Sequence, residues 1–467
     1  MPLNNPAPKL SPEQYEQNFA DIHPPLSPNS AVMEANRCLY CFDSPCMKAC
    51  PTHIDISTFI KKIATGNLKG SAKTILESNW VPLTCAKACP VDVLCEGACV
   101  YNDRGEMPIQ IGRLQRNAME WFYEHMPPMF TPAPKNGKSV GIIGSGPAGL
   151  ACGAELALLG YDVTIYEAKS VPGGLDTWGI APYKMTQEDS LKEIRLVESF
   201  GVKIVTSMAV GRDISVDQLT SRYDAVFIGI GLSQKTRMQI PGEDLEGVVD
   251  ARDFIETVTK RKWPQVEVGR RVAVIGGGNT AIDAATEAHR LGAQHVMMIY
   301  RRSKDEIPAY EFEVELARKD DVIFHWLTAP VAVKGRKTVE ALRCVRMQLG
   351  KPDASGRRSP EQIPGSEFDI PVDMVIRSVG SVTSEALVRS IPGLTIEGGR
   401  VVVDGETRQT TNPKFFAGGD CINGGKEVVN AAADGKMAAH GIHKWLSGGQ
   451  VHKTQVTNLK QTPNNKA

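Results

Sequence analysis

The sequence predicts an α/β protein in which a cysteine-rich helical segment precedes two nested units of parallel strands and helices. Eight of the eleven cysteines fall between about residues 31 and 128, where apolar residues recur at helical intervals. Two later segments, starting near residues 139 and 271, each repeat the order strand, glycine-rich turn, helix and strand. Apolar residues make up 42% of the 467 residues, which suffices for cores in about three domains.

The charge balance limits the classes of partner. Lysine plus arginine equals aspartate plus glutamate at 53 each, and a neutral chain without a basic block gives no reason to expect nucleic acid or an anionic membrane. The first residues lack the apolar core of a secretory signal, and no stretch approaches the ~18 apolar residues of a membrane span. We therefore expect a cytoplasmic protein, in which clustered cysteines stay reduced and serve as metal ligands or redox groups.

Composition and periodicity also predict the domain boundaries. Within the helical segment, "DISTFIKKIATGNLKGSAKTILESN" begins a helix with Asp55 or Ser57 as its N-cap. The Pro- and Gly-rich stretch "PPMFTPAPKNGK" is the clearest linker. The predicted regions are an extended arm (1–30), a helical cysteine domain (31–130), a first dinucleotide-binding domain (137–250 and 381–447), a second one inserted into it (251–380), and a disordered tail (448–467).

The first glycine-rich turn follows the apolar strand "SVGII". In a turn of this spacing the first glycine makes the bend, the second lets the backbone approach a pyrophosphate, and the third allows close packing of helix and strand. The N-terminus of the following helix offers amide donors to the phosphates, and an acid at the end of the second strand can hold ribose hydroxyls. The residues concerned are Gly144, Gly146, Pro147, Ala148, Gly149 and Glu167.

A later motif indicates which dinucleotide this turn binds. "TTNPKFFAGGDCI" resembles the second FAD motif of flavoenzymes with two dinucleotide domains, and "GGLDTWGIAPYK" resembles the loop that follows their ribose-binding acid. The resemblance implies FAD, with Asp420 at the ribityl chain and further contacts from Gly174, Leu175, Gly229 and the Gly418–Gly419 turn. A disulfide reductase would need paired cysteines near the flavin, so we predict that Cys152 and Cys421 are core residues.

The second glycine-rich turn, Gly276-x-Gly278-x-x-Ala281 with Asn279 and Thr280 between, repeats the device with alanine in third place. Its second strand ends in Arg301 and Arg302, where an NAD-preferring site commonly has an acid. Guanidinium groups there accept a 2′-phosphate, which favours NADPH, although they also suit a strand cap or a pyrophosphate. Two dinucleotide folds imply hydride transfer from nicotinamide to flavin, a step that needs no catalytic side chain.

The cysteines form two groups of runs, Cys38-x2-Cys41-x4-Cys46-x3-Cys50-Pro and Cys85-x3-Cys89-Pro followed by Cys95-x3-Cys99. The first run is close to, but not the same as, that of bacterial ferredoxins. Zinc also accepts cysteine thiolates, but the Cys-Pro pairs and the neighbouring flavin fold favour iron–sulfur. Eight cysteines suffice for two [4Fe–4S] clusters. A flavin beside clusters converts a two-electron donor into a one-electron donor.

From about residue 15 to 447 the chain resembles the NAD(P)H-oxidising half of dihydropyrimidine dehydrogenase, the small subunit in bacteria. "HPPLSPNSAVMEANRCLYCFDSPCMKACPTHIDISTFI" is the most specific match, and "PLTCAKACPVDVLCEGAC", "IQIGRLQRNA", "FIGIGL" and "FAGGD" continue it. The small subunit of bacterial glutamate synthase is a wider relative that differs around "CPTHIDI" and at the glutamine of "GRLQRNA".

The resemblance implies interleaved ligand sets, one of which includes a glutamine. Cluster 1 would be held by Cys38, Cys41, Cys46 and Cys99, and cluster 2 by Cys50, Cys89, Cys95 and Gln115. Cys85 would then be a bystander, whereas an all-cysteine alternative uses Cys85 in place of Gln115. The family's 2′-phosphate site matches at Arg301 and Arg302, but a further arginine is missing near "DEIPAY", which keeps NADH open.

The chain has no room for the FMN barrel in which this family reduces pyrimidines. The resemblance therefore implies an electron-input subunit that oxidises NAD(P)H at FAD. Electrons would pass singly through two clusters to an FMN- and iron–sulfur-containing partner that reduces uracil or thymine, in a hetero-oligomer, specifically a heterotetramer. The alternatives are a glutamate synthase small subunit or an NAD(P)H:ferredoxin-type oxidoreductase, and a non-catalytic zinc or iron–sulfur module that keeps its nucleotide folds for regulation.

Overall fold

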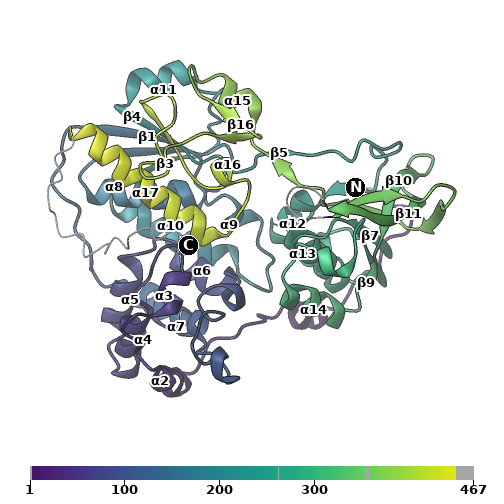
Figure 1. Ribbon diagram of the computed structural model, residues 1–467, viewed down its shortest axis with the longest axis horizontal. Helices are drawn as coiled ribbons and strands as arrows, with labels where there is room; N and C mark the ends of the chain where they lie inside the picture. Colours follow the sequence, from purple (N-terminus) through teal and green to yellow (C-terminus); the bar gives the residue numbers. More distant parts are fainter. Residues whose placement is uncertain (1–2, 261, 353–357, 449–467) are drawn as a thin grey trace. The chain divides into compact units, whose positions relative to one another are not determined.

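The computed structural model describes residues 3–260, 262–352 and 358–448, and its contacts divide the chain into two units (Figure 1). The main unit comprises Pro25–Gly174, Asp189–Leu232 and the chain from Thr383 onward, and the inserted unit comprises the chain up to Pro24, Leu175–Glu188 and Ser233–Val382. Apart from its first residue, the tail predicted at 448–467 lies outside the described residues. Among the described residues, no helix combines the length and apolar character that crossing a membrane requires.

The cysteine-rich part of the main unit is helical, as predicted. Its helices are α2 (Pro28–Arg37), α3 (Pro45–Ala49), α4 (Ile56–Ala64), α5 (Leu68–Leu76), α6 (Pro82–Ala88) and α7 (Ile111–His125). Asp55, not Ser57, is the N-cap of α4, because its carboxylate accepts the Thr58 amide at 3.1 Å. Apolar residues at helical spacing on α4 are buried in one core with α5 and α7, namely Ile56, Phe59, Ile60 and Ile63.

The rest of the main unit is a parallel sheet covered by helices, which confirms the first dinucleotide fold. The strand order is β18 (Phe415–Ala417), β4 (Ala225–Ile228), β1 (Ser139–Ile143), β2 (Asp162–Tyr166) and β3 (Lys203–Val205). Helix α8 (Pro147–Leu158) leaves the first glycine-rich turn and packs against the long helix α17 (Val428–Leu446). A side chain at Gly435 would clash with the Ala148 carbonyl oxygen, so a glycine permits this close approach.

Smaller elements complete the main unit. Helix α10 (Gln187–Ser199) and helix α11 (Val216–Arg222) connect strands of the sheet, and α16 (Asp420–Asn423) follows β18 directly. A short helix, α15 (Glu385–Arg389), and a two-stranded ribbon, β16 (Ile396–Glu397) with β17 (Arg400–Val401), lie between the inserted unit and β18 in the sequence. Cys152 and Cys421 are fully buried, as predicted for core residues.

The inserted unit has its own parallel sheet, in the order β6 (Val248–Asp250), β14 (Met374–Arg377), β7 (Arg271–Ile275), β8 (His295–Ile299) and β9 (Ile323–His325). Helices α12 (Ala251–Lys260), α13 (Asn279–Arg290) and α14 (Glu311–Lys319) accompany it, and β5 (Gln234–Lys235) pairs with β15 (Ser381–Val382). The second dinucleotide fold is thereby confirmed.

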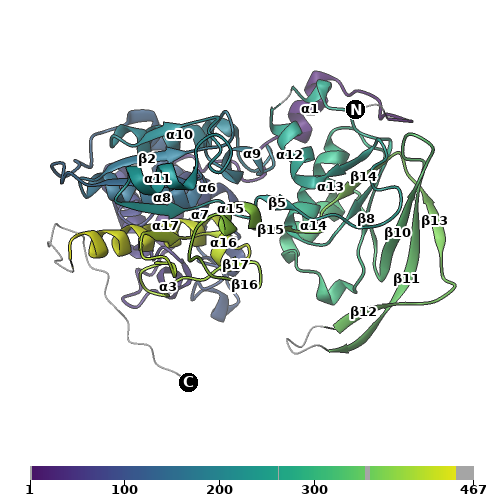
Figure 2. The same ribbon diagram turned by 90° about the horizontal axis from the view of Figure 1, so that it is seen from above.

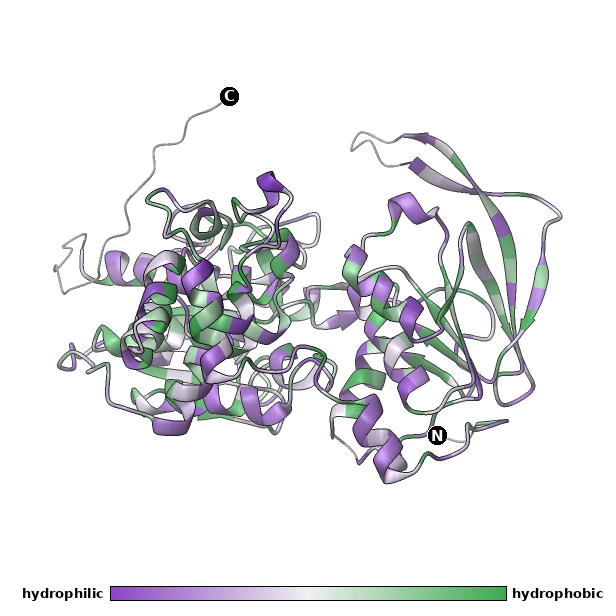
Figure 3. Ribbon diagram, turned by 90° about the horizontal axis from the view of Figure 1, so that it is seen from below, coloured by the Kyte–Doolittle hydropathy of each residue, from purple (hydrophilic) through white to green (hydrophobic). Residues whose placement is uncertain are grey.

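Between β9 and β14 the chain forms an antiparallel sheet of β10 (Thr328–Lys334), β11 (Ala341–Pro352), β12 (Arg358–Gln362) and β13 (Phe368–Pro371), which Figure 2 shows edge-on. Along β11 apolar and polar residues alternate, as the colours of Figure 3 show, because one face packs on the core and the other meets solvent. Cys344 on this strand is fully buried.

The N-terminal arm differs from the extended segment that composition predicts. Helix α1 (Pro12–Asn18) begins with a capping box between Ser11 and Gln14, a signal that the prediction overlooked. Phe19 stacks on Trp263 with ring centroids 4.4 Å apart, and the Ala7 amide donates to the Val268 carbonyl at 2.8 Å. The arm is therefore a packed part of the inserted unit, and α2 already begins at Pro28.

Two other boundaries also differ from the prediction. Strand β6 belongs to the inserted sheet because it pairs in parallel with β14, although residues up to 250 were predicted in the first domain. The segment Leu175–Glu188, which includes helix α9 (Leu175–Trp178), also belongs to the inserted unit. There the Tyr183 hydroxyl donates to Asp283 at 2.9 Å, and Lys184 forms ion pairs with Asp283 and Glu313, both at 2.6 Å.

Candidate functional site

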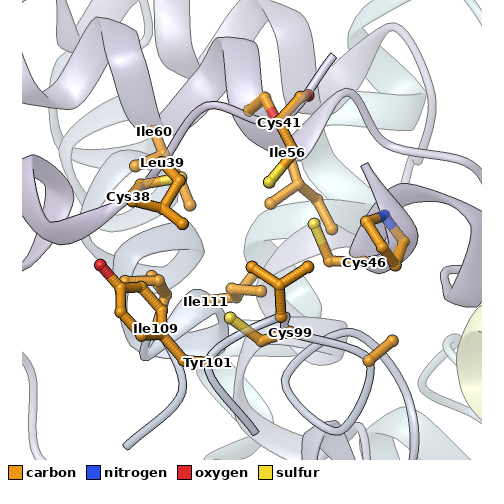
Figure 4. A pocket seen from close by; sticks show the side chains of 14 residues that line it. Cys38, Leu39, Cys41, Cys46, Ile56, Ile60, Cys99, Tyr101, Ile109 and Ile111 are labelled. Carbon is orange, nitrogen blue, oxygen red and sulfur yellow. The ribbon is translucent and has the colours of Figure 1, made fainter. Parts of the chain in front are cut away.

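Four cysteines from distant parts of the chain line one apolar cavity. Figure 4 shows their sulfurs around a common space together with side chains from α4 and from the start of α7. Three of them come from the α2–α3 region, and the fourth comes from the segment before α7. These are the four residues predicted for the first cluster, namely Cys38, Cys41, Cys46 and Cys99.

The local backbone positions this first cysteine group. Tyr40 has a positive φ of 50°, which turns the chain between the first two cysteines, and its hydroxyl donates to the Ala35 carbonyl at 2.9 Å. The Ser44 hydroxyl donates to the Cys41 carbonyl at 2.6 Å just before Pro45 opens α3. The loop is thus tied to α2 at one end and to α3 at the other.

The donor set suits a cluster with several metal ions. Burial raises the pKa of Cys46 to about 12, so its thiolate forms only with a cationic partner that offsets this desolvation. Four sulfurs spaced around a cavity match the way thiolates surround an iron–sulfur cluster.

A second cysteine group lies around α6. Cys85 and Cys50 are near neighbours of Cys89, and Cys50 is also near Cys95. The Asn79 side-chain amide donates to the Cys85 sulfur at 3.1 Å. The structure therefore brings Cys85 together with the three cysteines predicted for the second cluster.

Gln115, the predicted fourth ligand of that cluster, lies on α7 and is buried. Its amide nitrogen donates to the Pro82 carbonyl at 2.7 Å, which holds the side chain against the first residue of α6. The side-chain oxygen remains as the atom that could coordinate iron. The Gln115 side chain thus lies against α6, the helix that carries the alternative fourth ligand, Cys85.

Buried polar contacts clamp α6 to α10, the helix that precedes β3 of the flavin fold. The Glu193 carboxylate accepts the amides of Leu83 at 2.6 Å and Thr84 at 3.1 Å, and it also accepts the Thr84 hydroxyl. Burial raises the pKa of Glu193 to about 8. One turn along, Lys87 pairs with Asp189 at 2.7 Å. The helix that carries Cys85, and is followed directly by Cys89, is thereby fixed to the flavin fold.

The first glycine-rich turn is tightly packed at Gly144 and Gly149 and has open space at Gly146. Gly144 has a φ of +97°, and a Cβ at Gly149 would clash with the Gly144 carbonyl oxygen. A Cβ at Gly146, in contrast, would meet no atom within 4 Å. Pro147 and Ala148 form the first turn of α8, whose amides point to this open side. The turn therefore leaves the space that a pyrophosphate needs.

The acid at the end of β2 faces the same turn. The Glu167 carboxylate is buried and accepts the Ser145 amide at 3.1 Å and the Ser145 hydroxyl at 2.6 Å. This hydroxyl in turn accepts the Gly173 amide at 2.9 Å. The motif-based prediction missed Ser145, because position two of the turn accepts any residue, yet this side chain connects the acid to the next loop.

Other predicted FAD contacts gather at the same edge of the sheet. The Gly229 amide donates to the Ile143 carbonyl at 2.8 Å, and a Cβ at Gly174 would lie 2.8 Å from the Gly146 Cα. Gly419, with a φ of +76°, opens α16, and burial raises the pKa of Asp420, its first residue. Leu175 differs: it is half exposed, and it begins α9 of the inserted unit.

The second glycine-rich turn repeats this arrangement in the inserted unit. Gly276 has a φ of +145°, and a Cβ there would clash with the Ser378 carbonyl oxygen, whereas a Cβ at Gly278 would meet nothing within 4 Å. Ala281 is fully buried beneath the turn, and the Asn279 side chain accepts the Tyr310 amide at 3.1 Å. Thr280 is exposed on the first turn of α13.

The two arginines after β8, both predicted to contact a 2′-phosphate, have different environments. Arg301 is exposed, whereas Arg302 is buried and donates to the Arg358 carbonyl on β12 at 3.0 Å. The backbone of the antiparallel sheet thus engages Arg302, and Arg301 is the guanidinium free to meet a 2′-phosphate. This partner lies 56 residues away, so neighbouring residues in the sequence gave no signal of it.

Comparison with known families finds two matches. Residues 15–126 match the family described as dihydropyrimidine dehydrogenase domain II, 4Fe-4S cluster, and residues 138–435 match the pyridine nucleotide-disulphide oxidoreductase family. Among characterised relatives, the glutamate synthase [NADPH] small chain of Escherichia coli is 36% identical over 92% of this chain and 94% of its own. The NADPH-Fe(3+) oxidoreductase subunit beta of Geobacter sulfurreducens is 35% identical over 89% of this chain and 65% of its own.

Solved structures support the fold of the two dinucleotide domains. FprA of Mycobacterium tuberculosis in complex with NADPH superposes with a TM-score of 0.56 at 22% identity, over 68% of this chain and 85% of its own. Thioredoxin reductase of Lactococcus lactis superposes with a TM-score of 0.52 at 23% identity, over 67% of this chain and 99% of its own. The glycine-rich turns and the cysteine groups described above lie within the matched families.

Proposed function

Because the chain belongs to the pyridine nucleotide-disulphide oxidoreductase family, and within it to the iron–sulfur flavoproteins that include glutamate synthase small chains, we propose that it is the electron-input subunit of a larger redox enzyme. The observation that carries this proposal is the first cysteine group around one cavity, in the same unit as a dinucleotide fold. Together with the second fold, these sites combine a two-electron donor site with one-electron carriers in a single chain.

When bound, FAD takes up a hydride from NAD(P)H and the clusters pass the electrons on singly. The residues of this chain bind and orient these groups. The open sides at Gly146 and Gly278 admit the two pyrophosphates, Glu167 binds a ribose, and Arg301 favours NADPH. The first cluster is assigned to Cys38, Cys41, Cys46 and Cys99, and the second to Cys50, Cys89 and Cys95 with Gln115 or Cys85.

The clamp between α6 and α10 supports an order for these carriers. Glu193 and Lys87 tie α6, which carries Cys85 of the second cysteine group, directly to the flavin fold, so we place the second cluster next to FAD. Three of the four cysteines of the first group are partly exposed, Cys38, Cys41 and Cys46, against two of four in the second group, Cys89 and Cys95. Electrons would therefore leave the chain from the first cluster.

The fourth ligand of the second cluster is tested by two matched variants, Gln115→Ala and Cys85→Ser. If Gln115 coordinates iron, its replacement changes one cluster signal in EPR spectra and leaves FAD bound, while Cys85→Ser leaves both signals unchanged. The reverse pattern assigns Cys85.

The acceptor that the comparisons favour is the partner of a glutamate synthase small chain. Three relatives that match over 94% of their own length carry that name, and their names also specify NADPH. In such an enzyme this chain would supply electrons for the reductive transfer of the glutamine amide to 2-oxoglutarate on a separate subunit.

A specific observation favours a second candidate, the input subunit of a dihydropyrimidine dehydrogenase. The helical cysteine region matches the family described by that name, and "PTHID" and Gln115 lie inside the match. In this case uracil or thymine would be reduced to the 5,6-dihydropyrimidine on an FMN- and iron–sulfur-containing partner, in a hetero-oligomer.

An anaerobic purification of the tagged chain from its native host distinguishes the two candidates. The co-purified complex is assayed for NADPH oxidation with glutamine plus 2-oxoglutarate and, separately, with uracil. Turnover with the first pair supports the glutamate synthase assignment, and turnover with uracil supports the dehydrogenase. A chain that oxidises NADPH but never passes electrons to a second subunit would contradict the electron-input proposal itself.

A further inference from the structure

Exposed apolar side chains concentrate in the cysteine-rich region. Of the thirteen large hydrophobic residues that are exposed among the described residues, seven lie between residues 32 and 126, about a fifth of the chain. Isolated exposed apolar residues are ordinary, but a concentration of this kind marks an interaction surface. The seven are Val32, Met33, Leu39, Phe42, Val93, Met107 and Met126.

Four of these residues lie on α2, in the loop that carries the first cysteines, or in the segment that Arg37 holds against the end of α2, and we call them the apolar rim: Met33, Leu39, Phe42 and Met107. Leu39 lines the cavity of the first cysteine group, and Phe42, which directly follows Cys41, is 100% exposed. Arg37, one turn after Met33 on α2, donates to the Met107 carbonyl at 2.6 Å, so the segment of Met107 lies against the end of α2. Figure 1 shows α2 at the edge of the main unit, on the side away from β1.

Charged residues of both signs lie beside the apolar rim, and two pairs of them form ion pairs. Arg37 pairs with Glu34 at 2.8 Å, and Lys48 pairs with Asp43 at 2.7 Å. Lys61 lies over the ring of Tyr40, 4.5 Å from its centroid. The surface therefore offers apolar area without an excess of either charge. A complementary partner is likewise apolar and uncharged where it makes contact. This argues against an acidic carrier protein that binds through salt bridges.

We propose that the apolar rim docks the catalytic subunit that receives the electrons, with an apolar contact of this subunit placed over the first cluster. This inference rests on the proposed function of the first cysteine group as a cluster site. At the contact one electron leaves the reduced cluster of this chain, which is oxidised by one electron, and a one-electron iron–sulfur centre of the partner is reduced by one. No bond forms or breaks, no proton moves, and NAD(P)H supplies the electrons.

Docking by apolar contact predicts how the complex responds to substitution and to salt. A glutamate in place of Phe42 or Met107 would be desolvated at the contact without a partner, which weakens binding of the catalytic subunit by about tenfold or more. Raising the salt concentration would leave the binding of the wild-type chain unchanged or strengthen it, because no exposed charge pair carries the contact.

The test uses holo-protein carrying Phe42→Glu, Met107→Glu or, as a matched control, Ile323→Glu, an exposed apolar residue on β9 of the inserted unit. The probe is the catalytic subunit that co-purifies with the wild-type chain. Its affinity for each holo-protein is measured at low and high salt, together with NADPH-dependent ferricyanide reduction and the EPR signals of the clusters.

We expect both rim variants to lose at least about tenfold in affinity while ferricyanide reduction and the cluster signals stay at wild-type level. The control should bind as the wild type does. Equal binding by wild type and rim variants would overturn the docking proposal, and so would a rim variant that only converts a dimer of this chain to a monomer, or binding that high salt abolishes. If NADPH fails to reduce the clusters of the wild-type chain, the proposed function itself fails, which distinguishes the two results.

Discussion

The two dinucleotide folds share a backbone device and differ in one side chain. In each, a glycine of positive φ bends the turn and a second glycine leaves open space for a phosphate, as Gly146 and Gly278 do. At the end of the second strand, however, the first fold has the buried carboxylate of Glu167 and the second has the exposed guanidinium of Arg301. We infer that the turn provides phosphate binding in both folds, whereas the residue at the strand end would select which dinucleotide binds.

The comparison continues inside the helices that leave the two turns. Nine residues after the N-cap glycine, each helix carries a buried glutamate, Glu155 in α8 and Glu287 in α13. Glu155 accepts the Trp80 indole N–H at 2.9 Å and lies near Lys436 and His440. Both carboxylate oxygens of Glu287 are buried without a hydrogen-bond partner. Equivalent positions thus hold a paired and an unpaired acid.

The largest expected effect comes from the glycines of the first turn. Gly149→Ala puts a Cβ against the Gly144 carbonyl oxygen and should prevent the turn from closing, with loss of soluble folded protein. Gly146→Ala meets no protein atom, so the chain should fold with a normal circular dichroism spectrum but retain less than about a hundredth of the wild-type affinity for FAD. FAD content and thermal unfolding measure this. Gly146→Ala protein that purifies with full FAD would contradict the assignment of the site.

Gly278 of the second turn corresponds to Gly146 and allows the same substitution. Gly278→Ala should leave FAD bound and lower kcat/KM for NADPH by roughly 100-fold in ferricyanide reduction, because the Cβ occupies the space of the nicotinamide dinucleotide's pyrophosphate. Steady-state kinetics on the flavin-loaded variant tests it. If FAD is lost as well, the two turns do not serve separate nucleotides.

Replacing Arg301 or Arg302 by alanine should change the preference for NADPH over NADH by unequal amounts. Arg301→Ala removes the exposed guanidinium and should raise KM for NADPH by about 10–50-fold with little change for NADH, since only NADPH carries the 2′-phosphate. Arg302 donates to the Arg358 carbonyl, so Arg302→Ala should act mainly on thermal stability and should alter the NADPH:NADH preference much less. Measuring KM for both nucleotides decides this. Equal losses of preference would restore the prediction that both arginines bind the phosphate.

Replacing the buried Glu155 or Glu287 by glutamine should give the smallest effects, and the two changes in stability at neutral pH should have opposite signs. Although burial opposes ionisation, Lys436 and His440 lower the pKa of Glu155 to about 2, so its contribution to stability is present above the ordinary pKa of about 4.5 and is lost as the pH falls toward 2. Glu155→Gln should therefore destabilise by on the order of 1 kcal/mol at pH 7 and progressively less under acid conditions.

Burial raises the pKa of Glu287 well above its ordinary value, so it is protonated in the folded state, and stability falls as the pH rises above about 4.5. Glu287→Gln, which is neutral at every pH, should match the wild type near pH 4 and exceed its thermal stability at pH 8. Both predictions are tested by measuring the unfolding temperatures of the two variants and the wild type between pH 4 and 8. Parallel pH profiles would contradict the assignment of a paired and an unpaired acid.

Local signals made some features predictable and left others out of reach. The glycine-rich turns and the acid at 167 each depend on a few neighbouring residues, so the sequence indicated them directly, and it narrowed the cap of α4 to Asp55 or Ser57. The first and last cysteines of the first group are separated by 61 residues in the sequence. Their grouping around one cavity was predicted only because a family resemblance supplied the ligand set. Strand β6 is three residues long, and its place in the inserted sheet depends on pairing with β14, far along the chain.

The central claim is that electrons from NADPH pass beyond the flavin into the clusters of this chain. It is tested most directly by titrating the purified holo-protein with NADPH without oxygen or acceptor, while absorbance reports FAD and EPR reports the clusters. We predict that the chain takes up more than one equivalent of NADPH per FAD and that signals of reduced [4Fe–4S] clusters appear as the flavin bleaches. Uptake that ends at one equivalent, with a bleached flavin and no cluster signal, would contradict the account.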